Sequence, residues 1–514
     1  MVLSKIKPLY LFLLVVFLSL IFRITNLDLI EFKIDEASNL LLATRLMFGH
    51  PLPYGGITSS VGILNPPLFN YILIPFTLIS LDPKVIVAII ALINSLAIGL
   101  FFLIIKKYYN TALALIASLI LAFSPWLIIF SRKIWPPDLI FPFSVLLFFS
   151  IHKIIIEKKI VFWITFVLSS LFLIQLDLSS AFFILLISAF LVIQKPQLNW
   201  KYIMIGLVLG ILPMLPYLVY EFKNSCPDCL LLLTFNKQLD IRSPEVFIRS
   251  LQILNQGNFK FILRNDTLTF FTNYPFVYQL KSIFYIEYLL IPIGMLLFWM
   301  KNKDLRFIVY AILGLPILYF IFRLGSFMHY YVILVPFLCL FLSISFYALI
   351  KSKNYTLRYG SIGILLTVII YSIIFNFYLF VIIRKQSGLN GDYGASFNKT
   401  LPYVEQQIVE YKNRKDYQEI LLSSYIDVSA MRGISPFAIM IYPPKETEKN
   451  LKAIEERLKN DPNDPRILQE LLVYYTSQKI TRPYVDYIKK KITISPAYEI
   501  IYNEVNHLYN ASQY

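Results

Sequence analysis

The stretch MVLSKIKPLYLFLLVVFLSLIF (residues 1–22) begins with two lysines and continues as a long apolar run. About 18 or more consecutive apolar residues are enough to cross the hydrocarbon core of a bilayer as a helix. The stretch has no small-residue cleavage site of the kind that ends a signal peptide. We therefore expect an uncleaved transmembrane helix over residues 8–24, with Lys5 and Lys7 on the cytoplasmic side.

The rest of the 514-residue chain has the same character. Hydrophobic residues make up 57% of it and charged residues only 15%, which is typical of a multi-pass membrane protein. The formal net charge of +16 comes from Lys and Arg that cluster at the ends of apolar runs, as the positive-inside rule predicts. No motif interleaves basic and aromatic residues as nucleic-acid-binding proteins do. We therefore expect the lipid bilayer, and no nucleic acid, as a partner.

The basic clusters predict an all-α polytopic membrane protein with about eleven transmembrane helices. After the first, the expected spans are residues 84–105, 111–130, 138–152, 160–176, 178–194, 202–220, 284–300, 307–322, 330–350 and 359–383. This threading creates a first outer loop at 25–82 and a long outer loop at 221–283, with everything from 384 outside the cytoplasm. We expect interfacial helices in the first outer loop, because NPPLFNYILIPFTLIS (residues 65–80) is barely long enough to span.

The composition changes near residue 384, where charged residues, Asn, Gln and Pro become more frequent. We therefore predict a transmembrane domain over residues 1–383 and a small extracytoplasmic soluble domain over 384–514, either α/β or helical. EILLSSYIDV (residues 419–428) is typical of a strand. NLKAIEERLKNDPNDPRILQELLVYY (residues 450–475) predicts two helices broken by Asp-Pro turns.

The chain has three cysteines. Cys339 lies in an apolar run, whereas Cys226 and Cys229 form a CPDC motif in the long outer loop. Two cysteines supply half of a usual zinc site, and no second CxxC motif occurs. A local disulfide in an oxidising compartment and a pair of free thiols both fit this spacing, and zinc is a weaker alternative.

Two adjacent carboxylates, Asp35 and Glu36, follow the first expected span. They begin the segment IDEASNLLLATRLMFG (residues 34–49), in which apolar residues recur at helical spacing. We expect an amphipathic helix on the membrane surface, whose N-terminus favours Asp35 as an anion. Asp35 could then act as a general base, and Glu36 could support it or contact an acceptor.

Further polar residues gather at the same predicted outer face: Arg132, Lys133, Asp138, Asp177, Arg323, His329 and Tyr330. Charges at membrane depth are costly and usually functional, and these basic residues lie on the side that the positive-inside rule disfavours. Such a group indicates an anion site, and a lipid-linked sugar would bring a phosphate leaving group to it. Direct displacement of that phosphate predicts inversion at the sugar carbon. No cofactor is expected; carboxylates beside a phosphate could recruit Mg²⁺ or Mn²⁺, but we do not favour a metal.

These segments together resemble glycosyltransferase family 39 of the GT-C superfamily, a family that includes protein O-mannosyltransferases and the aminoarabinose transferases of lipid A. The resemblance covers most of residues 10–385. The segments that carry it are IDEASNLLLATRLMFG (34–49), NPPLFNYIL (65–73), SPWLIIFSRKIWPPDLI (124–140), LIQLDLSSAF (173–182), LPYLVYEFKN (215–224) and HYYVILVPFL (329–338), and GDYGASF (391–397) resembles the opening of the C-terminal domain in bacterial members.

The resemblance implies a GT-C fold with a catalytic acid in the first outer loop, at the position of Asp35. It also implies a polyprenyl-phosphate sugar donor, whose phosphate would be bound by basic residues. Arg132 is the best match for that role, and Lys133, Arg323 and His329 are further candidates.

The chain departs from the family pattern at two positions. Asn65 stands where Lys or His often precedes the Pro-Pro pair, and Asp177 stands where His is frequent. We expect direct substrate contacts from a set of five residues, namely Asn65, Trp135, Asp138, Asp177 and Tyr330.

These observations predict an inverting membrane glycosyltransferase, a hexosyl or pentosyl transferase, that moves a sugar to a protein, lipid or glycan on the extracytoplasmic face of the cell membrane. Two other classes stay open. A transporter or flippase of lipid-linked sugars would need inverted repeats or broken helices near the midplane, and no clear internal repeat is visible. A non-catalytic scaffold, whose outer domain binds a partner, would tolerate substitution of Asp35.

Overall fold

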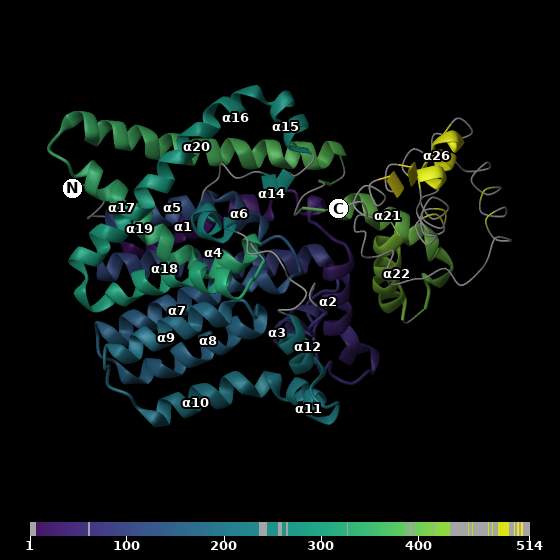
Figure 1. Ribbon diagram of the computed structural model, residues 1–514, viewed down its shortest axis with the longest axis horizontal. Helices are drawn as coiled ribbons and strands as arrows, with labels where there is room; N and C mark the ends of the chain where they lie inside the picture. Colours follow the sequence, from purple (N-terminus) through teal and green to yellow (C-terminus); the bar gives the residue numbers. More distant parts are fainter. Residues whose placement is uncertain are drawn as a thin grey trace.

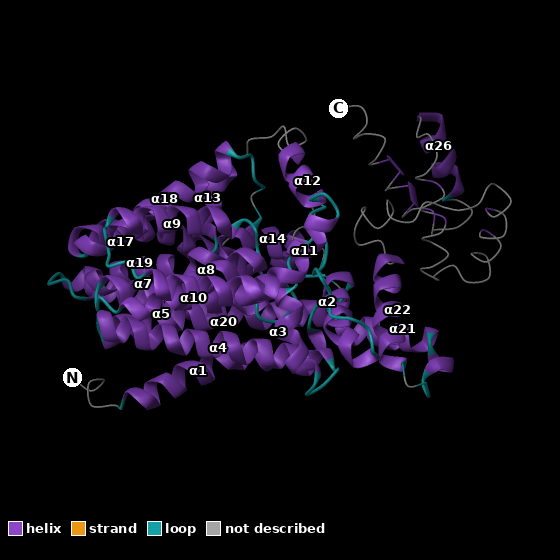
Figure 2. Ribbon diagram, turned by 90° about the horizontal axis from the view of Figure 1, so that it is seen from below, coloured by secondary structure: helices purple, strands orange, loops and turns teal. Residues whose placement is uncertain are grey.

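The computed structural model describes residues 7–431, apart from 60–61, 236–243, 255–259, 264–265, 326, 387, 390–392, 395 and 415. Beyond 431 it describes residues 451, 455, 471, 475, 482–492, 498, 501–502 and 505–506. Helices and loops make up this part of the chain (Figure 2), and its strand-like pairings are two isolated bridges, Glu31 with Ser396 and Thr58 with Leu64.

Each of the eleven predicted spans contains a helix. The helices are α1 (Pro8–Ile24), α4 (Pro83–Tyr108), α5 (Thr111–Phe123), α7 (Ile140–Ile155), α8 (Trp163–Leu176), α9 (Ser180–Ile193), α10 (Trp200–Ile211) continued by α11 (Leu215–Lys223), α17 (Tyr285–Lys301), α18 (Arg306–Ile321), α19 (Val335–Ile350) and α20 (Tyr355–Gln386).

Seven helical segments of the described chain are long and apolar enough to cross a membrane, judged by length and composition. They are 83–108, 136–155, 200–223, 275–301, 303–321, 328–350 and 355–386. The helices α1, α5, α8 and α9 are apolar but shorter. The all-α polytopic fold class is therefore confirmed, and the crossing of the membrane by these four shorter helices stays a prediction.

Capping residues set the starts of α4 and α5. The Asp82 side chain accepts a hydrogen bond from the Lys84 N–H (2.9 Å), and Pro83 occupies the first turn of α4. Asn110 caps α5 in the same way, through the N–H of Leu113 (2.9 Å). Such caps satisfy amide groups that the first helical turn leaves unpaired, so α4 and α5 form a tight hairpin.

The long helices lie side by side and share one buried apolar core (Figure 1). Two short helices from the 25–82 segment, α2 (Ile34–Thr44) and α3 (Leu68–Thr77), gather at one end of the bundle with α11 and α12 (Pro227–Phe235). The helices predicted for the first loop are thus present, and their interfacial position stays a prediction.

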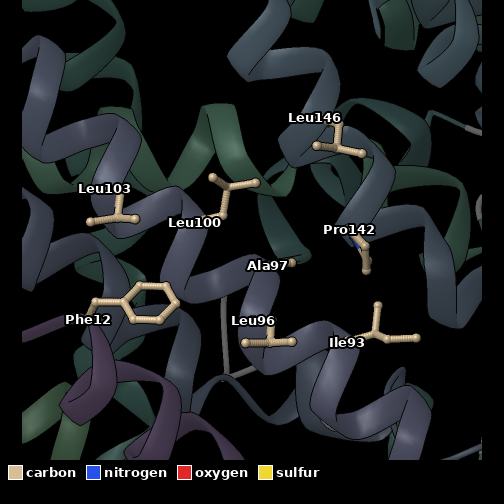
Figure 3. A pocket seen from close by; sticks show the side chains of 8 residues that line it. All are labelled: Phe12, Ile93, Leu96, Ala97, Leu100, Leu103, Pro142 and Leu146. Atoms are coloured by element: carbon tan, nitrogen blue, oxygen red, sulfur yellow. The ribbon is translucent and has the colours of Figure 1, made fainter. Parts of the chain in front are cut away.

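A shallow apolar groove of about 400 Å³ runs between α1, α4 and α7 (Figure 3). Its lining consists of Phe12, Ile93, Leu96, Ala97, Leu100, Leu103, Pro142 and Leu146. No polar side chain lines it, so the groove suits a lipid-facing surface and offers nothing for the chemistry predicted above.

The strand predicted at 419–428 is wrong, because these residues form part of α22 (Tyr417–Met431). Leu422 and Tyr425, one helical turn apart, are both buried, and the Tyr425 ring meets the edge of Phe32 at 4.8 Å. Packing of α22 against α2 therefore decides the conformation of a segment whose apolar residues fit a strand as well as a helix.

The described residues beyond 384 contribute to two apolar clusters. Phe397 and Leu422, from α21 (Phe397–Gln407) and α22, join the core of the membrane part. A second cluster contains Leu471, Tyr475, Val485, Ile488, Tyr498, Ile501 and Val505. The domain boundary at 383/384 stays a prediction, and most of the predicted helix pair at 450–475 lies outside the described residues.

Candidate active site

The acid pair lies in the first turn of α2, as the sequence predicts. Lys33 precedes the helix with an extended backbone, and the Glu36 side chain accepts a hydrogen bond from its N–H (3.1 Å). This is half of a capping-box arrangement, which places Asp35 and Glu36 beside the unpaired amides of the helix start. The partial positive charge there favours Asp35 as an anion.

Asn39 ties α2 to its surroundings one turn further along. Its side-chain amide donates to the carbonyls of Asp35 (2.9 Å) and Ile134 (3.1 Å). Asn70 of α3 donates in turn to the Asn39 carbonyl (3.1 Å). The acid pair is therefore fixed against both α3 and the 131–135 segment, which carries Lys133.

Glu31 organises the site, although the sequence did not indicate this role. It is fully buried and pairs with two lysines, Lys33 at 2.5 Å and the buried Lys133. Its Oε1 also accepts a hydrogen bond from the Gly394 N–H (2.8 Å). A Cβ at residue 394 would lie 2.8 Å from that oxygen, so a larger residue there would push against the carboxylate. The signal in the sequence was the resemblance of GDYGASF to a family segment, since that segment contains Gly394.

The ion pairs decide the charge of this cluster. Burial opposes ionisation of Glu31, but the charges of Lys133 and Lys33 outweigh it and lower the pKa of Glu31 to about 2. The Glu31 carboxylate raises the pKa of Lys33, and it raises the pKa of Lys133 despite the burial of that ammonium. Two cations and one anion therefore meet beside Asp35, which leaves the cluster electropositive before the acid pair is counted.

The two acids of the pair differ in environment. Burial is the main cause that raises the pKa of Glu36, with the nearby Glu31 charge adding to it, and the value is about 8. Glu36 is therefore protonated at neutral pH. Burial also raises the pKa of Asp35, but this carboxylate is only half-buried. Its oxygens make no hydrogen bond or ion pair within the described part of the chain, so Asp35 is the acid that is available to a substrate.

An aromatic surface continues from Lys133. The Lys133 ammonium lies 5.6 Å from the ring centre of Trp135, which meets His329 edge-on at 4.8 Å. The His329 ring is 4.5 Å from that of Tyr330. Asp138 belongs to the same region, since its Oδ2 accepts a hydrogen bond from the Lys133 N–H (3.0 Å). The structure thus brings four predicted site residues around Lys133.

Asp177 lies beyond Tyr330, at the turn between α8 and α9. Its Oδ1 accepts a hydrogen bond from the Ser179 N–H (2.9 Å), whereas Oδ2 is buried and has no hydrogen-bond partner among the described residues. Burial raises the pKa of Asp177 to about 6. Arg323 lies just after α18 and has a positive φ of 55°. It follows Tyr319 by four residues, and the Tyr319 hydroxyl donates a hydrogen bond to the Tyr330 carbonyl (3.4 Å).

Arg132 has a structural role that the sequence did not indicate. Its guanidinium donates to the carbonyls of Phe22, Arg23, Thr25 and Asn26 at 2.7–2.9 Å. These carbonyls lie at the C-terminal end of α1, where helical carbonyls lack intrahelical partners. Arg132 therefore caps α1, and its binding to a phosphate stays a prediction that would require these bonds to change.

Asn65 also takes part in local structure. Its side-chain amide donates to the Ile57 carbonyl (2.8 Å), and the Gly56 N–H donates to the Asn65 carbonyl (2.7 Å). These bonds join Gly56 and Ile57 to Asn65 ahead of α3, and substrate contact by Asn65 stays a prediction.

Comparison with known proteins adds little to this geometry. No protein-family model matches the chain, and no curated protein is significantly similar to it in sequence. Among solved structures, apo ArnT from Cupriavidus metallidurans aligns over 81% of this chain and 84% of its own, with 12% identity and a TM-score of 0.49. The undecaprenyl phosphate complex of ArnT gives a TM-score of 0.47, with 12% identity over 82% of this chain and 84% of its own.

The apo oligosaccharyltransferase of Archaeoglobus fulgidus aligns over 82% of this chain with 13% identity and a TM-score of 0.46. The aligned region spans 60% of that protein's length. Likenesses of this strength are too weak to assign the chain to a family or an activity.

The protonated state of Glu36 predicts a pH effect on stability. A carboxyl with a pKa of about 8 in the folded protein and about 4.5 when unfolded binds a proton on folding between these pH values. The wild type should therefore lose stability as the pH rises from about 5 to 8, by at most about 5 kcal/mol. Glu36→Gln should flatten this decline. Thermal unfolding in detergent across this range measures it, with Asp28→Asn as an exposed-acid control.

The control should follow the wild-type curve, because Asp28 lies on the surface. Parallel curves for the wild type and Glu36→Gln would show that Glu36 is already ionised at neutral pH.

Proposed function

We propose that this chain is an inverting glycosyltransferase of the cell membrane, which transfers a sugar from a polyprenyl-phosphate donor to an acceptor on the extracytoplasmic side. The observation that carries the proposal is the environment of Asp35. A half-buried carboxylate without a hydrogen-bond partner in the described chain stands at a helix N-terminus, beside the buried Lys133. The resemblance to glycosyltransferase family 39 supports the same reading, since Asp35 falls at the position of the catalytic acid.

The arrangement suits direct displacement at the anomeric carbon. Asp35 takes the proton of the acceptor hydroxyl as its oxygen attacks. The bond between the anomeric carbon and the phosphate oxygen breaks, and polyprenyl phosphate leaves with an additional negative charge. In this proposal Lys133 and Lys33 stabilise that charge. A single displacement inverts the configuration at the sugar carbon.

The neighbouring residues have supporting roles in this proposal. Glu31 holds Lys133 in place through the buried ion pair, so it is a positioning residue. Trp135, His329 and Tyr330 offer ring faces and edges on which a sugar can lie. Glu36 is protonated at neutral pH and therefore suits hydrogen-bond donation rather than proton abstraction. The proposal includes no required metal.

Transfer in isolated membranes tests the proposal. Membranes that contain the wild-type protein are supplied with radiolabelled polyprenyl-phosphate sugars. We expect label in an acceptor, release of polyprenyl phosphate, and an inverted anomeric configuration by nuclear magnetic resonance. Retained configuration would contradict a single displacement. Movement of the intact donor across the membrane without transfer would favour a flippase, and neither activity across several donors would favour a scaffold.

A further inference from the structure

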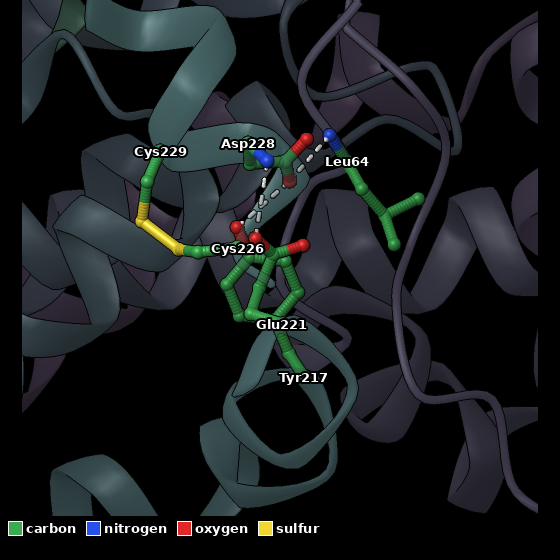
Figure 4. Close-up of a disulfide and its surroundings, with 6 residues drawn as sticks. All are labelled: Leu64, Tyr217, Glu221, Cys226, Asp228 and Cys229. Carbon is green, nitrogen blue, oxygen red and sulfur yellow. Dashed lines mark hydrogen bonds between the residues drawn. A yellow bond between two sulfur atoms is a disulfide. The ribbon is translucent and has the colours of Figure 1, made fainter. Parts of the chain in front are cut away.

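The turn between α11 and α12 gathers three side chains that can bind a metal. Glu221 lies near the end of α11, and Cys226 and Cys229 lie around the start of α12. A carboxylate oxygen of Glu221 and the two sulfur atoms lie within 4.8 Å of one another. The two sulfurs form a disulfide (Figure 4). Within the described chain, this is the one group of three or more such residues with this spacing.

The backbone of the turn directs the cysteines towards Glu221. The Cys226 N–H donates to the Glu221 carbonyl at 2.7 Å, so the chain folds back where α11 ends. Ser225 and Cys226 both have positive φ angles, 61° and 56°, which residues other than glycine adopt at an energetic cost. The tight reversal brings a CxxC pair against a carboxylate that precedes it by five residues.

The Glu221 carboxylate lacks one partner. The residue is 5% exposed, and its Oε2 accepts a hydrogen bond from the Asp228 N–H (3.1 Å). Its Oε1 is buried and has no hydrogen-bond partner in the described chain. A buried carboxylate oxygen without a partner is costly, so the site favours a bound cation or a proton there.

Asp228 shapes the turn but is otherwise engaged. Its Oδ2 accepts hydrogen bonds from the Tyr217 hydroxyl (2.8 Å) and from the Leu64 N–H (3.1 Å). These bonds hold the start of α12 against both α11 and Leu64. The turn that carries the potential ligands is therefore held in place by hydrogen bonds on both sides.

We propose that Glu221, Cys226 and Cys229 bind a zinc ion when the two cysteines are reduced. Thiolate sulfur and carboxylate oxygen are both common zinc ligands, and a CxxC pair is a common spacing for two of them. Three protein ligands leave a fourth tetrahedral position for water. The sequence offered only the two cysteines, and the fold adds the third ligand.

The disulfide and the zinc site are alternative states of the same cysteines. Two molecules of a thiol reductant break the sulfur–sulfur bond by thiol–disulfide exchange, which yields two cysteine thiols and one disulfide of the reductant. Zinc then displaces the two thiol protons. A small-molecule disulfide reverses the exchange: it re-forms the Cys226–Cys229 bond, is itself reduced to two thiols, and the zinc ion is released. This proposal does not depend on the proposed glycosyltransferase activity.

Zinc binding by the purified full-length protein tests the inference. The protein in detergent is reduced with a thiol, freed of the thiol by anaerobic gel filtration, and titrated with Zn²⁺ against a chromophoric chelator. We expect one zinc ion per reduced chain and none per oxidised chain. Co²⁺ in place of Zn²⁺ should show thiolate-to-cobalt charge-transfer absorption.

Glu221→Gln keeps both cysteines and is the main test variant. Substitution of a residue that only orients a metal ligand typically lowers metal affinity about 10- to 100-fold. Loss of Glu221 as a direct ligand should therefore weaken zinc binding at least about tenfold. Cys226→Ser should abolish the cobalt charge-transfer band of a two-thiolate site. Cys339→Ser is the matched control, since Cys339 is buried in α19, and its zinc binding should equal that of the wild type.

Two outcomes would overturn the inference. Reduced wild-type protein that binds no zinc would exclude the site. Zinc binding that Glu221→Gln leaves unchanged would exclude the three-ligand arrangement. A monodisperse elution profile of each variant shows whether a loss of binding reflects a lost ligand, and Glu221→Gln carries the test if the cysteine variant does not fold.

Discussion

Asp35→Asn is expected to reduce sugar transfer by about 100- to 10,000-fold, the usual contribution of general acid–base catalysis. The amide has the shape of the carboxylate but cannot take the proton of the acceptor hydroxyl. Donor binding should persist, because Lys33 and Lys133 keep their pairing with Glu31. Initial rates in membranes, normalised to the amount of protein, give the catalytic loss. Retention of labelled donor by the purified variant measures whether donor binding persists.

Asp28→Asn is the matched control for that experiment. Asp28 belongs to the same segment but forms an exposed ion pair with Arg384 at 3.2 Å. Exposed ion pairs contribute little to stability, so the transfer rate of Asp28→Asn should stay within about twofold of the wild-type rate. A wild-type rate in Asp35→Asn would exclude Asp35 as the base, and Glu36→Gln would be measured next.

Glu31→Gln is expected to destabilise the protein by about 3–5 kcal/mol, the range for removing one partner of a buried ion pair. Glu31 is fully buried and Lys133 is 4% exposed, so the substitution leaves an ammonium buried without its counter-charge. Lys33 is partly exposed and can turn towards solvent, which limits the loss to one cation. Thermal or denaturant unfolding in detergent measures the effect.

A second substitution separates the ion pair from the rest of the site. In the double variant Glu31→Gln/Lys133→Met, no uncompensated buried ammonium is left at residue 133. The double variant should therefore lose less stability than the sum of the two single losses. Additive losses would show that Lys133 is not held mainly by Glu31.

The helical membrane architecture and the position of the acid pair could both be predicted from the amino-acid sequence alone. Apolar runs long enough to span a bilayer can be recognised as helices from local sequence, since a helix in the membrane satisfies its own backbone hydrogen bonds. The start of α2 is equally local, because Glu36 reaches back to the Lys33 N–H across a single turn. Asp35 was therefore placed at a helix N-terminus without any knowledge of the fold.

Local apolar patterning failed at residues 419–428, which form a helix instead of the predicted strand. Ile420 and Leu422 are two residues apart, as on one face of a strand, whereas Leu422 and Tyr425 are three apart, as on one face of a helix. Contact of α22 with α2 decided the outcome. The opposite case is α4, whose length and capping residues left no alternative.

Which charged groups meet depends instead on how distant segments of the chain pack. Glu31 accepts a hydrogen bond from Gly394, 363 residues away. Arg132 caps α1 through Phe22, 110 residues away. A sequence shows that a charge occurs in an apolar chain, but the cost of burying that charge is offset by whichever partner the packing brings near, and that partner is set by the fold.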